Sequence, residues 1–295
     1  MVGGSRVNVR HAILTLYRQV AQPFSGRRLR RVPILNWLHE FILSSLKSTT
    51  AHVHGHRMTL DPTDALRLSL DEVHEALAAK LVKQTIRPGD IVLDIGANIG
   101  YYTLIFAKLT GKQGKVFAFE PIPNNFALLK KNVEENGYDN VILINQPVSD
   151  RGEKIKFYLS QDPTMHRLYP FPGNKAEVEL DAIRLDEFQP LLQTIDFMKI
   201  DVVGAEWKVL QGASMIIKAN PRLTIMTGFW PAGFRQAGFS PEAYLKFLEE
   251  QGFVIYWINE TEKKAEAIQI SPFMARFEGK DDEDVNLWCT RSPLV

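Results

Sequence analysis

One segment, residues 91–109, constrains the fold of this chain more than any other. Its first four residues form an apolar run that ends in Asp94, and this pattern predicts a buried strand. Gly96 and Gly100 bracket the turn that follows, and an apolar helix pattern begins at Thr103. In α/β proteins a strand, a glycine turn and a helix N-terminus together form a nucleotide-sized pocket. We therefore expect a ligand beyond the end of this strand.

The turn lacks the glycines that a dinucleotide requires. The fingerprint G-x-G-x-x-G would place glycine at positions 96, 98 and 101, but Asn98 and Tyr101 stand at the last two. Because the second glycine lets the backbone approach a pyrophosphate, Asn98 disfavours a nicotinamide oxidoreductase. The segment instead resembles motif I of the class I methyltransferases, which bind S-adenosylmethionine. A glycine turn can also be purely steric. The resemblance implies that this cofactor is held by Asp94, Gly96, Asn98, Gly100 and Tyr101.

Strands and helices alternate regularly from residue 86 onward, and a βαβαβ series predicts a doubly wound α/β sheet. Residues 151–185 interrupt the alternation and predict a small antiparallel insertion with a long loop at 162–172. The main sheet is expected to be mostly parallel and Rossmann-like, as in class I methyltransferases. It should contain seven strands, at 91–94, 115–119, 141–144, 195–200, 223–227, 253–258 and 286–290.

The first 60 residues differ in charge from the rest of the chain. They contain nine Lys or Arg residues and one acid, a net charge of +8, which leaves −7 for the remainder. Apolar residues recur at helical spacing in 9–21 and 32–47, so we expect a basic helical extension, residues 1–60, before a catalytic domain at 61–295. The extension is either a helical cap on this domain or an amphipathic anchor for an anionic membrane or a charged lipid-linked substrate. Nucleic acid is disfavoured, since aromatic residues do not alternate with the basic ones and the body is acidic.

Composition is that of an ordinary globular protein. Hydrophobic residues make up 45% of the chain and charged residues 23%, and no apolar run reaches the length of a membrane span. The single cysteine, Cys289, excludes an intramolecular disulfide and a cysteine-based zinc site. The start of the chain lacks the charged-then-apolar pattern of a secretory signal. We therefore expect a cytoplasmic protein, associated with the inner membrane face only if the basic extension acts as an anchor.

Two further groups of residues have competing interpretations. His52, His54 and His56 alternate, so on one strand they would share a face and could bind a metal, but no carboxylate lies close to them in sequence. We favour a surface hairpin and predict no metal site. Residues 71–84 read as a helix that covers one end of the pocket. Glu75 on this helix is either solvated, which we favour, or within reach of the cofactor.

The ends of the later parallel strands supply further candidates, because ligands of open α/β sheets bind beyond these ends. Glu120 follows the second strand, 26 residues after the acid of the first. An acid at this place can accept hydrogen bonds from both ribose hydroxyls of a nucleoside. We expect the adenine after the third strand, where Asn145 or Gln146 would contact the edge of the base. Asp150 follows them and would either bind the cofactor or cap the next turn.

The motifs occur in an order that is more specific than any one of them. They are Asp94–Tyr102, Phe119-Glu120-Pro121 with Asn125-Phe126, Val148-Ser149-Asp150 and Lys199-Ile200-Asp201-x-x-Gly204-Ala205-Glu206. Across residues 60–260 this ordered set resembles the FkbM-type methyltransferases, a branch of the class I fold. The resemblance implies S-adenosylmethionine-dependent O-methylation. Members of that family act on hydroxyls of sugars in oligosaccharides or glycolipids, or of polyketide products, so a small-molecule or glycan acceptor is implied.

Methyl transfer to oxygen needs an aligned acceptor and a base that removes the hydroxyl proton. Asp201, after the fourth parallel strand, and His166, in the loop of the insertion, are our candidate bases. Glu206 would orient the acceptor or help hold a cation. Val203 and Gly228 stand where the FkbM pattern commonly has acids. The alternative hypothesis is therefore a non-catalytic S-adenosylmethionine-binding protein whose basic extension is an interaction module.

Overall fold

The computed structural model describes residues 47–71, 73–172, 174–188 and 194–294. The helices expected at 9–21 and 32–47 lie outside the described residues apart from Lys47. The basic extension and its boundary at residue 60 therefore stay predictions. Among the residues that the structure describes, none of the helices combines the length and the apolar character needed to cross a bilayer.

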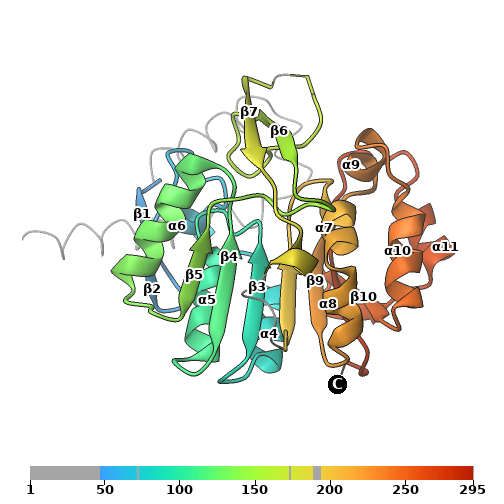
Figure 1. Ribbon diagram of the computed structural model, residues 1–295, viewed down its shortest axis with the longest axis horizontal. Coiled ribbons are helices and arrows are strands. Elements are labelled where there is room, and N and C mark those ends of the chain that lie inside the picture. The colour runs from blue at the N-terminus through green and yellow to red at the C-terminus, as the bar shows by residue number, and fades with distance from the viewer. Residues whose placement is uncertain (1–46, 72, 173, 189–193, 295) are drawn as a thin grey trace, which may run out of the picture.

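A mostly parallel sheet forms the centre of the molecule (Figure 1). In the described part of the chain it has eight strands in the order β11-β10-β12-β9-β8-β3-β4-β5, of which β9, β8, β3, β4 and β5 are parallel. All seven predicted strands form, and β11 is an additional antiparallel edge strand paired with β10. The strands are β3 (Ile91–Ile95), β4 (Lys115–Phe119), β5 (Val141–Ile144), β8 (Phe197–Ile200), β9 (Thr224–Phe229), β10 (Val254–Asn259), β11 (Lys264–Ala267) and β12 (Val285–Thr290).

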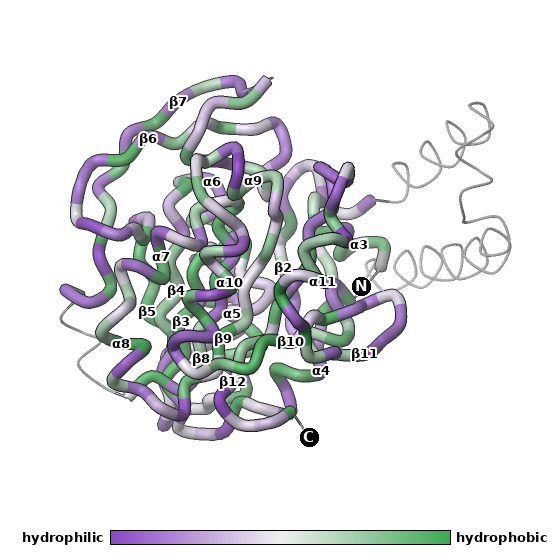
Figure 2. Tube along the Cα trace, turned by 90° about the vertical axis from the view of Figure 1, so that its right-hand side faces the viewer, coloured by the Kyte–Doolittle hydropathy of each residue, from purple (hydrophilic) through white to green (hydrophobic). Residues whose placement is uncertain are grey.

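Helices cover both faces of the sheet, which makes it doubly wound as expected (Figure 1). Side chains alternate between the faces, so Val92 packs on the side of α4 and α5 while Leu93 packs on the side of α7, α8 and α10. Figure 2 shows hydrophobic residues following the central strands. The helices are α3 (Leu68–Asp71), α4 (Ala76–Thr85), α5 (Tyr101–Thr110), α6 (Pro123–Glu135), α7 (Glu206–Gly212), α8 (Ser214–Ala219), α9 (Pro231–Gln236), α10 (Pro241–Glu250), α11 (Ile270–Ala275) and a 3₁₀ turn at Leu185–Glu187.

The register of the parallel strands brings their carboxyl ends to one edge. Ile95, the last residue of β3, is paired with Phe119 of β4 on one side and with Ile200 of β8 on the other. The residues that follow these three strands, Gly96, Glu120 and Asp201, therefore meet at the same edge.

The insertion predicted at 151–185 forms a two-stranded antiparallel sheet of β6 (Lys154–Leu159) and β7 (Ala176–Asp181). It stands beyond one edge of the main sheet, at the top of Figure 1. The connecting loop folds back so that Arg167 forms a bridge with Tyr158 of β6. The amide of Asn125 on α6 also donates to the carbonyl of Pro163, which holds this loop near the start of α6.

A second antiparallel hairpin, β1 (Thr50–Val53) and β2 (His56–Thr59), precedes the main domain. It packs on α6, where the amide of Asn132 bonds to both the backbone N–H and the carbonyl of Thr59. The hairpin favoured over a metal site is confirmed. His54 lies in its turn, so the three histidines do not share one strand face.

Two helices differ from the sequence prediction. The helix expected at 71–84 begins only at Ala76, because Glu75 has a left-handed backbone with φ of 49°. The carboxylate of Glu260 accepts hydrogen bonds from the first free N–H groups of this helix. The helix expected at about 205–219 is divided into α7 and α8 at Ala213. At the preceding Gly212 a Cβ atom would lie 2.1 Å from the carbonyl oxygen of Ser149, so the backbone must pass very close there.

Candidate active site

A cavity of about 440 Å³ opens at the carboxyl edge of the sheet. Its walls are the turn after β3, the residues after β4, loop residues 163–168, the turn after β8 and the end of β9. This volume lies within the usual range for cofactor and small-molecule sites. Of the predicted site residues, the cavity is lined by Gly96, Asn98, Tyr101, Glu120, Gln146, His166, Asp201 and Glu206.

The glycine turn after β3 passes very close to the residues that follow β8. Gly96 has φ of 81°, and a Cβ atom there would lie 2.0 Å from the carbonyl oxygen of Asp201. The turn can therefore approach β8 only with glycine at this position. Gly100 has a different role, since a Cβ atom there would lie 2.8 Å from the side chain of Leu129 on α6. Gly100 permits helix packing and does not line the cavity.

Glu120 is held rigidly at the floor of the cavity. It is 4% exposed, and its two carboxylate oxygens accept hydrogen bonds from the backbone N–H groups of Asn98 (2.9 Å) and Ile122 (2.8 Å). Burial raises the pKa of this carboxyl group to about 7, although the two N–H groups oppose the shift. The carboxylate thus has a fixed position and remaining lone pairs, which suits the recognition of paired hydroxyls.

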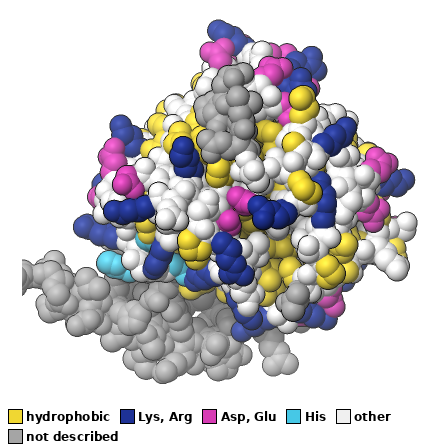
Figure 3. Space-filling view, turned by 60° about the horizontal axis from the view of Figure 1, so that its bottom comes forward, with side chains coloured by type: hydrophobic (Ala, Val, Ile, Leu, Met, Phe, Trp, Pro, Cys, Tyr) yellow, Lys and Arg dark blue, Asp and Glu magenta, His cyan; other side chains and the backbone are white. Residues whose placement is uncertain are grey.

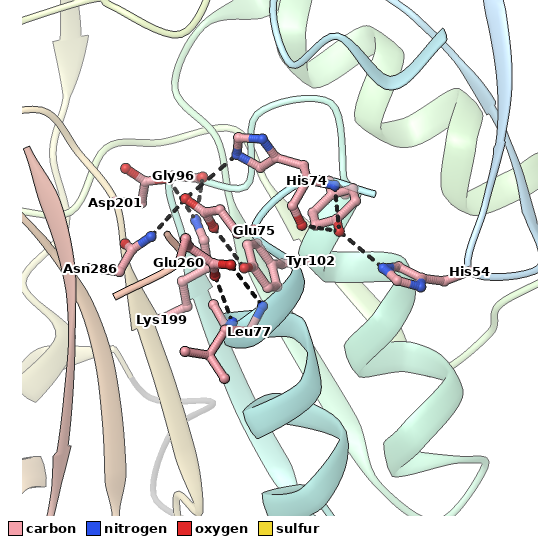
Figure 4. A network of polar contacts seen from close by, with 12 residues as sticks. His54, His74, Glu75, Leu77, Gly96, Tyr102, Lys199, Asp201, Glu260 and Asn286 are labelled. Carbon is pink, nitrogen blue, oxygen red and sulfur yellow. Dashed lines mark hydrogen bonds and ion pairs between the residues drawn. The ribbon is translucent and has the colours of Figure 1, made fainter. Parts of the chain in front are cut away.

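A buried lysine that the sequence interpretation left without a role connects the cavity to the core (Figure 4). The ammonium of Lys199 is 3.7 Å from Asp94, 3.2 Å from Asp201 and 3.3 Å from the carbonyl oxygen of Gly96. Although burial alone would lower the pKa of Lys199, the carboxylates of Asp201 and Asp94 raise it. A lysine between core positions of a strand, as in Phe197-Met198-Lys199-Ile200, is the sequence signal that could have identified it.

Asp94 does not line the cavity. It is fully buried, and one of its oxygens accepts a hydrogen bond from the hydroxyl of Thr103 on α5. Asp94 also pairs with the ammonium of Lys199, at 3.7 Å. It therefore positions the lysine and the start of α5 without lining the cavity itself. Asp150 is also outside the cavity, where it pairs with Lys208 at 3.2 Å and with Arg151.

Glu75 lines the cavity, so the expectation that it is solvated is wrong. Its carboxylate accepts hydrogen bonds from the hydroxyl of Tyr102 and the amide of Asn286, each at 2.7 Å (Figure 4). The neighbouring hydroxyl of Tyr101 donates to the carbonyl of His74 at 2.5 Å. Tyr101 therefore offers the cavity its ring, while its hydroxyl holds the segment that carries Glu75.

Glu206 lies at the start of α7 and lines the cavity. It is 2% exposed, and burial together with the nearby charge of Asp201 raises the pKa of its carboxyl group to about 8. One oxygen of Glu206 is buried without a hydrogen-bond partner among the described atoms. A Cβ atom on Gly228 would lie 3.6 Å from both carboxylates. The glycine therefore leaves the space in front of this pair of acids open.

The loop of the insertion forms part of the cavity wall through residues 163–168. The Nδ1 atom of His166 accepts a hydrogen bond from the backbone N–H of Ser160 at 3.0 Å, and burial lowers the pKa of the imidazole. The neutral ring therefore carries its proton on Nε2 and presents a donor. The guanidinium of Arg167 lies 4.6 Å from the ring centres of both Phe171 and Trp230, and its Nε is buried without a partner among the described atoms.

The loop after β5 contributes one of the predicted site residues to the cavity. Gln146 lines the cavity, and its amide donates to the carbonyl of Asp181 at the end of β7 at 3.1 Å. This bond connects the insertion to the loop after β5. Across the part of the chain that the structure describes, no three His, Cys, Asp or Glu side chains are grouped closely enough to hold a metal ion.

Comparison with known proteins identifies the family. A sequence model described as the methyltransferase FkbM domain matches residues 94–255. The chain belongs to the FkbM methyltransferase family. S-adenosylmethionine is accordingly the methyl donor. The matched segment begins at Asp94 and includes the glycine turn, Glu120, Asp201 and Glu206.

Individual relatives of this FkbM methyltransferase are distant. Methyltransferase 1 of Beauveria bassiana is 28% identical over 172 residues, which cover 50% of this chain and 69% of that protein. The 31-O-demethyl-FK506 methyltransferase FkbM of Streptomyces tacrolimicus is 30% identical over 159 residues, 43% of this chain and 60% of that protein, so the match spans less than two thirds of it. A SAM dependent methyltransferase from Aquifex aeolicus has a similar structure, with a TM-score of 0.43 and 15% identity over 79% of this chain and all of that one.

Proposed function

We propose that this protein transfers a methyl group from S-adenosylmethionine to a hydroxyl oxygen of a neutral sugar, glycan, glycolipid or related secondary metabolite. The observation that carries the proposal is a pair of carboxyl groups in unlike environments. Asp201 is open to the cavity, with its side chain 57% exposed and its carboxylate paired to Lys199, whereas Glu206 beside it is almost fully buried. Such a pair can supply a proton acceptor and a proton-bearing donor at one place.

The cavity residues fit the methyl donor. Glu120 would accept hydrogen bonds from the ribose hydroxyls, because its carboxylate is already fixed by two backbone N–H groups. The turn at Gly96 and Asn98 would receive the amino-acid portion, because both residues line the cavity. Gln146 would lie beside the adenine. When bound, S-adenosylmethionine supplies a methyl group made electrophilic by its sulfonium.

Residues of the chain itself would carry out the acid–base chemistry. Asp201 would take the proton of the acceptor hydroxyl, and the ammonium of Lys199 at 3.2 Å holds the carboxylate in place for this step. Glu206, whose pKa is raised to about 8, would keep its proton near neutral pH and donate to an oxygen of the acceptor. His166 would serve as a second donor through Nε2, because its Nδ1 is already bonded to Ser160. We therefore prefer Asp201 to His166 as the base.

The surroundings of these groups favour an uncharged, hydroxyl-bearing acceptor. Asp282 and Asp284 line the same cavity as Asp201 and Glu206, so a negatively charged acceptor would be repelled. Trp230 adds an aromatic wall on which an apolar ring face can pack. The name of the Streptomyces relative also gives that protein an oxygen acceptor, 31-O-demethyl-FK506. Gly228 stands where the FkbM pattern commonly has an acid, but Asp201 and Glu206 are still present beside it. The presence of these two acids favours catalysis over a purely binding role.

The proposal is tested with an acceptor panel. The full chain is incubated with S-adenosylmethionine and with neutral glycosides, sugar acids, amines and polyketide alcohols, and release of S-adenosylhomocysteine is measured. We expect turnover with hydroxyl acceptors and little with sugar acids. Asp201→Asn should abolish the turnover, while Asp139→Asn, which changes an exposed acid outside the cavity, should not. Turnover with amines alone would overturn the proposal.

The basic extension supports a separate proposal, that residues 1–60 bring the enzyme to an anionic membrane face. Its support is the net charge of +8 in this segment. Full-length chain should cosediment with vesicles that contain phosphatidylglycerol and be released by high salt. Equal cosedimentation of a chain that lacks residues 1–46 would contradict this proposal.

A further inference from the structure

A second cavity, of about 300 Å³, lies between the turn of the β1–β2 hairpin and the helices α4 and α5. It shares none of its lining residues with the cofactor cavity. Its lining consists of two histidines of the hairpin, one lysine from each helix and two apolar residues of α5: His54, His56, Lys83, Lys108, Ile105 and Leu109. Neither the methyl donor nor the acceptor accounts for this cavity.

Two ammonium groups converge on a single residue of this cavity. The Nζ atom of Lys83 lies 3.0 Å from Nδ1 of His54, and Lys108 donates to the carbonyl oxygen of the same histidine at 3.3 Å. Within the described ranges, neither lysine forms an ion pair with a carboxylate. Like charges gathered around one residue repel one another, and an anion bound between them would relieve this repulsion.

The two histidines of the cavity add no positive charge to that of the lysines near neutral pH. Burial lowers the pKa of His56 to about 4, and the charges of Lys108 and Lys83 act in the same direction. Burial also lowers the pKa of His54, again with both lysines contributing. The Nε2 atom of His56 pairs with the hydroxyl of Tyr138 at 2.6 Å, which fixes the ring. No carboxylate contributes to either shift, so both rings lie in a positive field.

We propose that this second cavity binds the phosphate or sulfate group of a ligand, with Lys83 and Lys108 as its charged donors. Each lysine is exposed at its own helix, so the ligand can enter from solvent, while Ile105 and Leu109 close the inner side. A tetrahedral oxyanion has enough lone pairs to accept from both ammonium groups at once. The face in Figure 3 has histidine side chains at its edge with Lys or Arg side chains beside them. Two of the three alternating histidines of the sequence, His54 and His56, would thus frame the anion.

The test uses the full chain labelled with ¹³C-histidine, because seven histidines give a simple spectrum. Inorganic phosphate is titrated at constant ionic strength against sodium chloride, and the ring signal of His54 is followed. Two double variants remove the same charge. Lys83→Gln with Lys108→Gln changes the cavity, whereas Lys80→Gln with Lys112→Gln changes exposed lysines on α4 and after α5 that do not line it.

We expect phosphate to shift the His54 signal saturably, with binding weakened at least about tenfold in the cavity variant and unchanged in the control variant. Phosphatidylcholine vesicles with and without phosphatidic acid form a second arm. A larger loss of vesicle binding in the cavity variant than in the control would identify a lipid headgroup as the source of the phosphate. A response to inorganic phosphate alone would identify a soluble ligand. Equal phosphate binding by both double variants, or a response no greater than that to chloride, would overturn the proposal.

Discussion

The ammonium group of Lys199 lies 3.2 Å from the carboxylate of Asp201 and joins the cavity to the buried Asp94 behind it, at 3.7 Å. Lys199 is 5% exposed and Asp94 is completely buried. Asp201 is therefore the only one of the three with a side chain largely open to the cavity. The ion pair fixes the proposed base to the centre of the sheet and makes Lys199 a positioning residue.

Removal of this lysine should cost stability. Lys199→Met leaves the carboxylate of Asp94 buried without its cation, and breaking a buried pair in this way costs about 3–5 kcal/mol. Urea denaturation should show this loss in the free energy of unfolding, while the exposed Lys80→Met should stay near wild type. If both variants unfold at the same urea concentration, the lysine does not compensate Asp94. Addition of Asp94→Asn to Lys199→Met should restore part of the stability.

Glu120 should dominate affinity for the methyl donor. Glu120→Gln keeps the shape of the side chain but removes the charged acceptor, which should weaken S-adenosylmethionine binding by roughly 2–4 kcal/mol. Isothermal titration calorimetry measures the loss. Glu134→Gln, which changes an exposed acid on α6, is the matched control. Wild-type affinity in the Glu120→Gln variant would remove this residue from the cofactor site.

The same residue predicts how cofactor affinity depends on pH. Burial raises the pKa of Glu120 to about 7, so the carboxylate that accepts hydroxyl hydrogen bonds becomes populated only as the pH rises through this value. Affinity should therefore strengthen between about pH 6 and pH 8 and be flat for Glu120→Gln. Conversely, stability contributed by the protonated group is fully present below the ordinary glutamate pKa of 4.5 and is lost as the pH rises through about 7. Calorimetry over this range, with denaturation of the free protein in parallel, checks both signs.

Substitutions of Asp201 and Glu206 should have different effects on turnover. Asp201→Asn removes the base and should lower kcat by roughly 10²–10⁴-fold, with little change in S-adenosylmethionine affinity. Glu206→Gln imitates the protonated carboxyl group, so kcat near pH 7 should stay within about tenfold of wild type. Because the pKa of Glu206 is raised to about 8, wild-type kcat should fall above this pH and the variant should not show that fall. A large loss in Glu206→Gln at pH 7 would mean that the ionised form is required.

Gly96 and Gly137 form a matched pair for the glycine turn. Both have a positive φ, but a Cβ atom would meet the carbonyl oxygen of Asp201 at 2.0 Å in the first case and nothing within 4 Å in the second. Gly137→Ala should cost about 1–2 kcal/mol for the backbone alone. Gly96→Ala should cost clearly more and should also prevent cofactor binding. Thermal unfolding of the two variants compares them directly, and equal shifts in Tm would show that the steric contact is relieved.

The alternation of strands with helices and the acids that follow the strands predicted most of the elements that position the site. The seven strands and the insertion follow from apolar runs and from the alternation of strands with helices. The cavity positions of Glu120 and Asp201 follow from acids at strand ends, and that of Glu206 from the helix that begins after Asp201. Lys199 was missed as a functional residue because its buried partner Asp94 lies on β3, which becomes a neighbour of β8 only in the folded sheet.

The remaining differences have similar physical causes. Arg167 and Trp230 meet across two loops far apart in sequence, and periodicity carries no information about such contacts. Glu75 was expected in water because the helix was predicted to begin too early. Its left-handed backbone and the capping carboxylate of Glu260 turn it toward the cavity.

Val203 offers a test of strain next to the proposed base. It is β-branched and has φ of 38°, a conformation that such residues rarely adopt. Val203→Asn should raise the free energy of unfolding by roughly 1 kcal/mol, because asparagine tolerates this region. Chemical denaturation measures the change, and a destabilised variant would show that packing of the valine outweighs the strain.

The atom that receives the methyl group tests the central claim most directly. An acceptor that gives turnover is incubated with S-adenosylmethionine carrying a ¹³C-methyl group, and the product is analysed by NMR. The account predicts a methyl signal bonded to oxygen, formed by the wild-type chain and by Asp139→Asn but not by Asp201→Asn. A methyl signal bonded to nitrogen or carbon, or an oxygen-bonded signal of undiminished rate with Asp201→Asn, would contradict it.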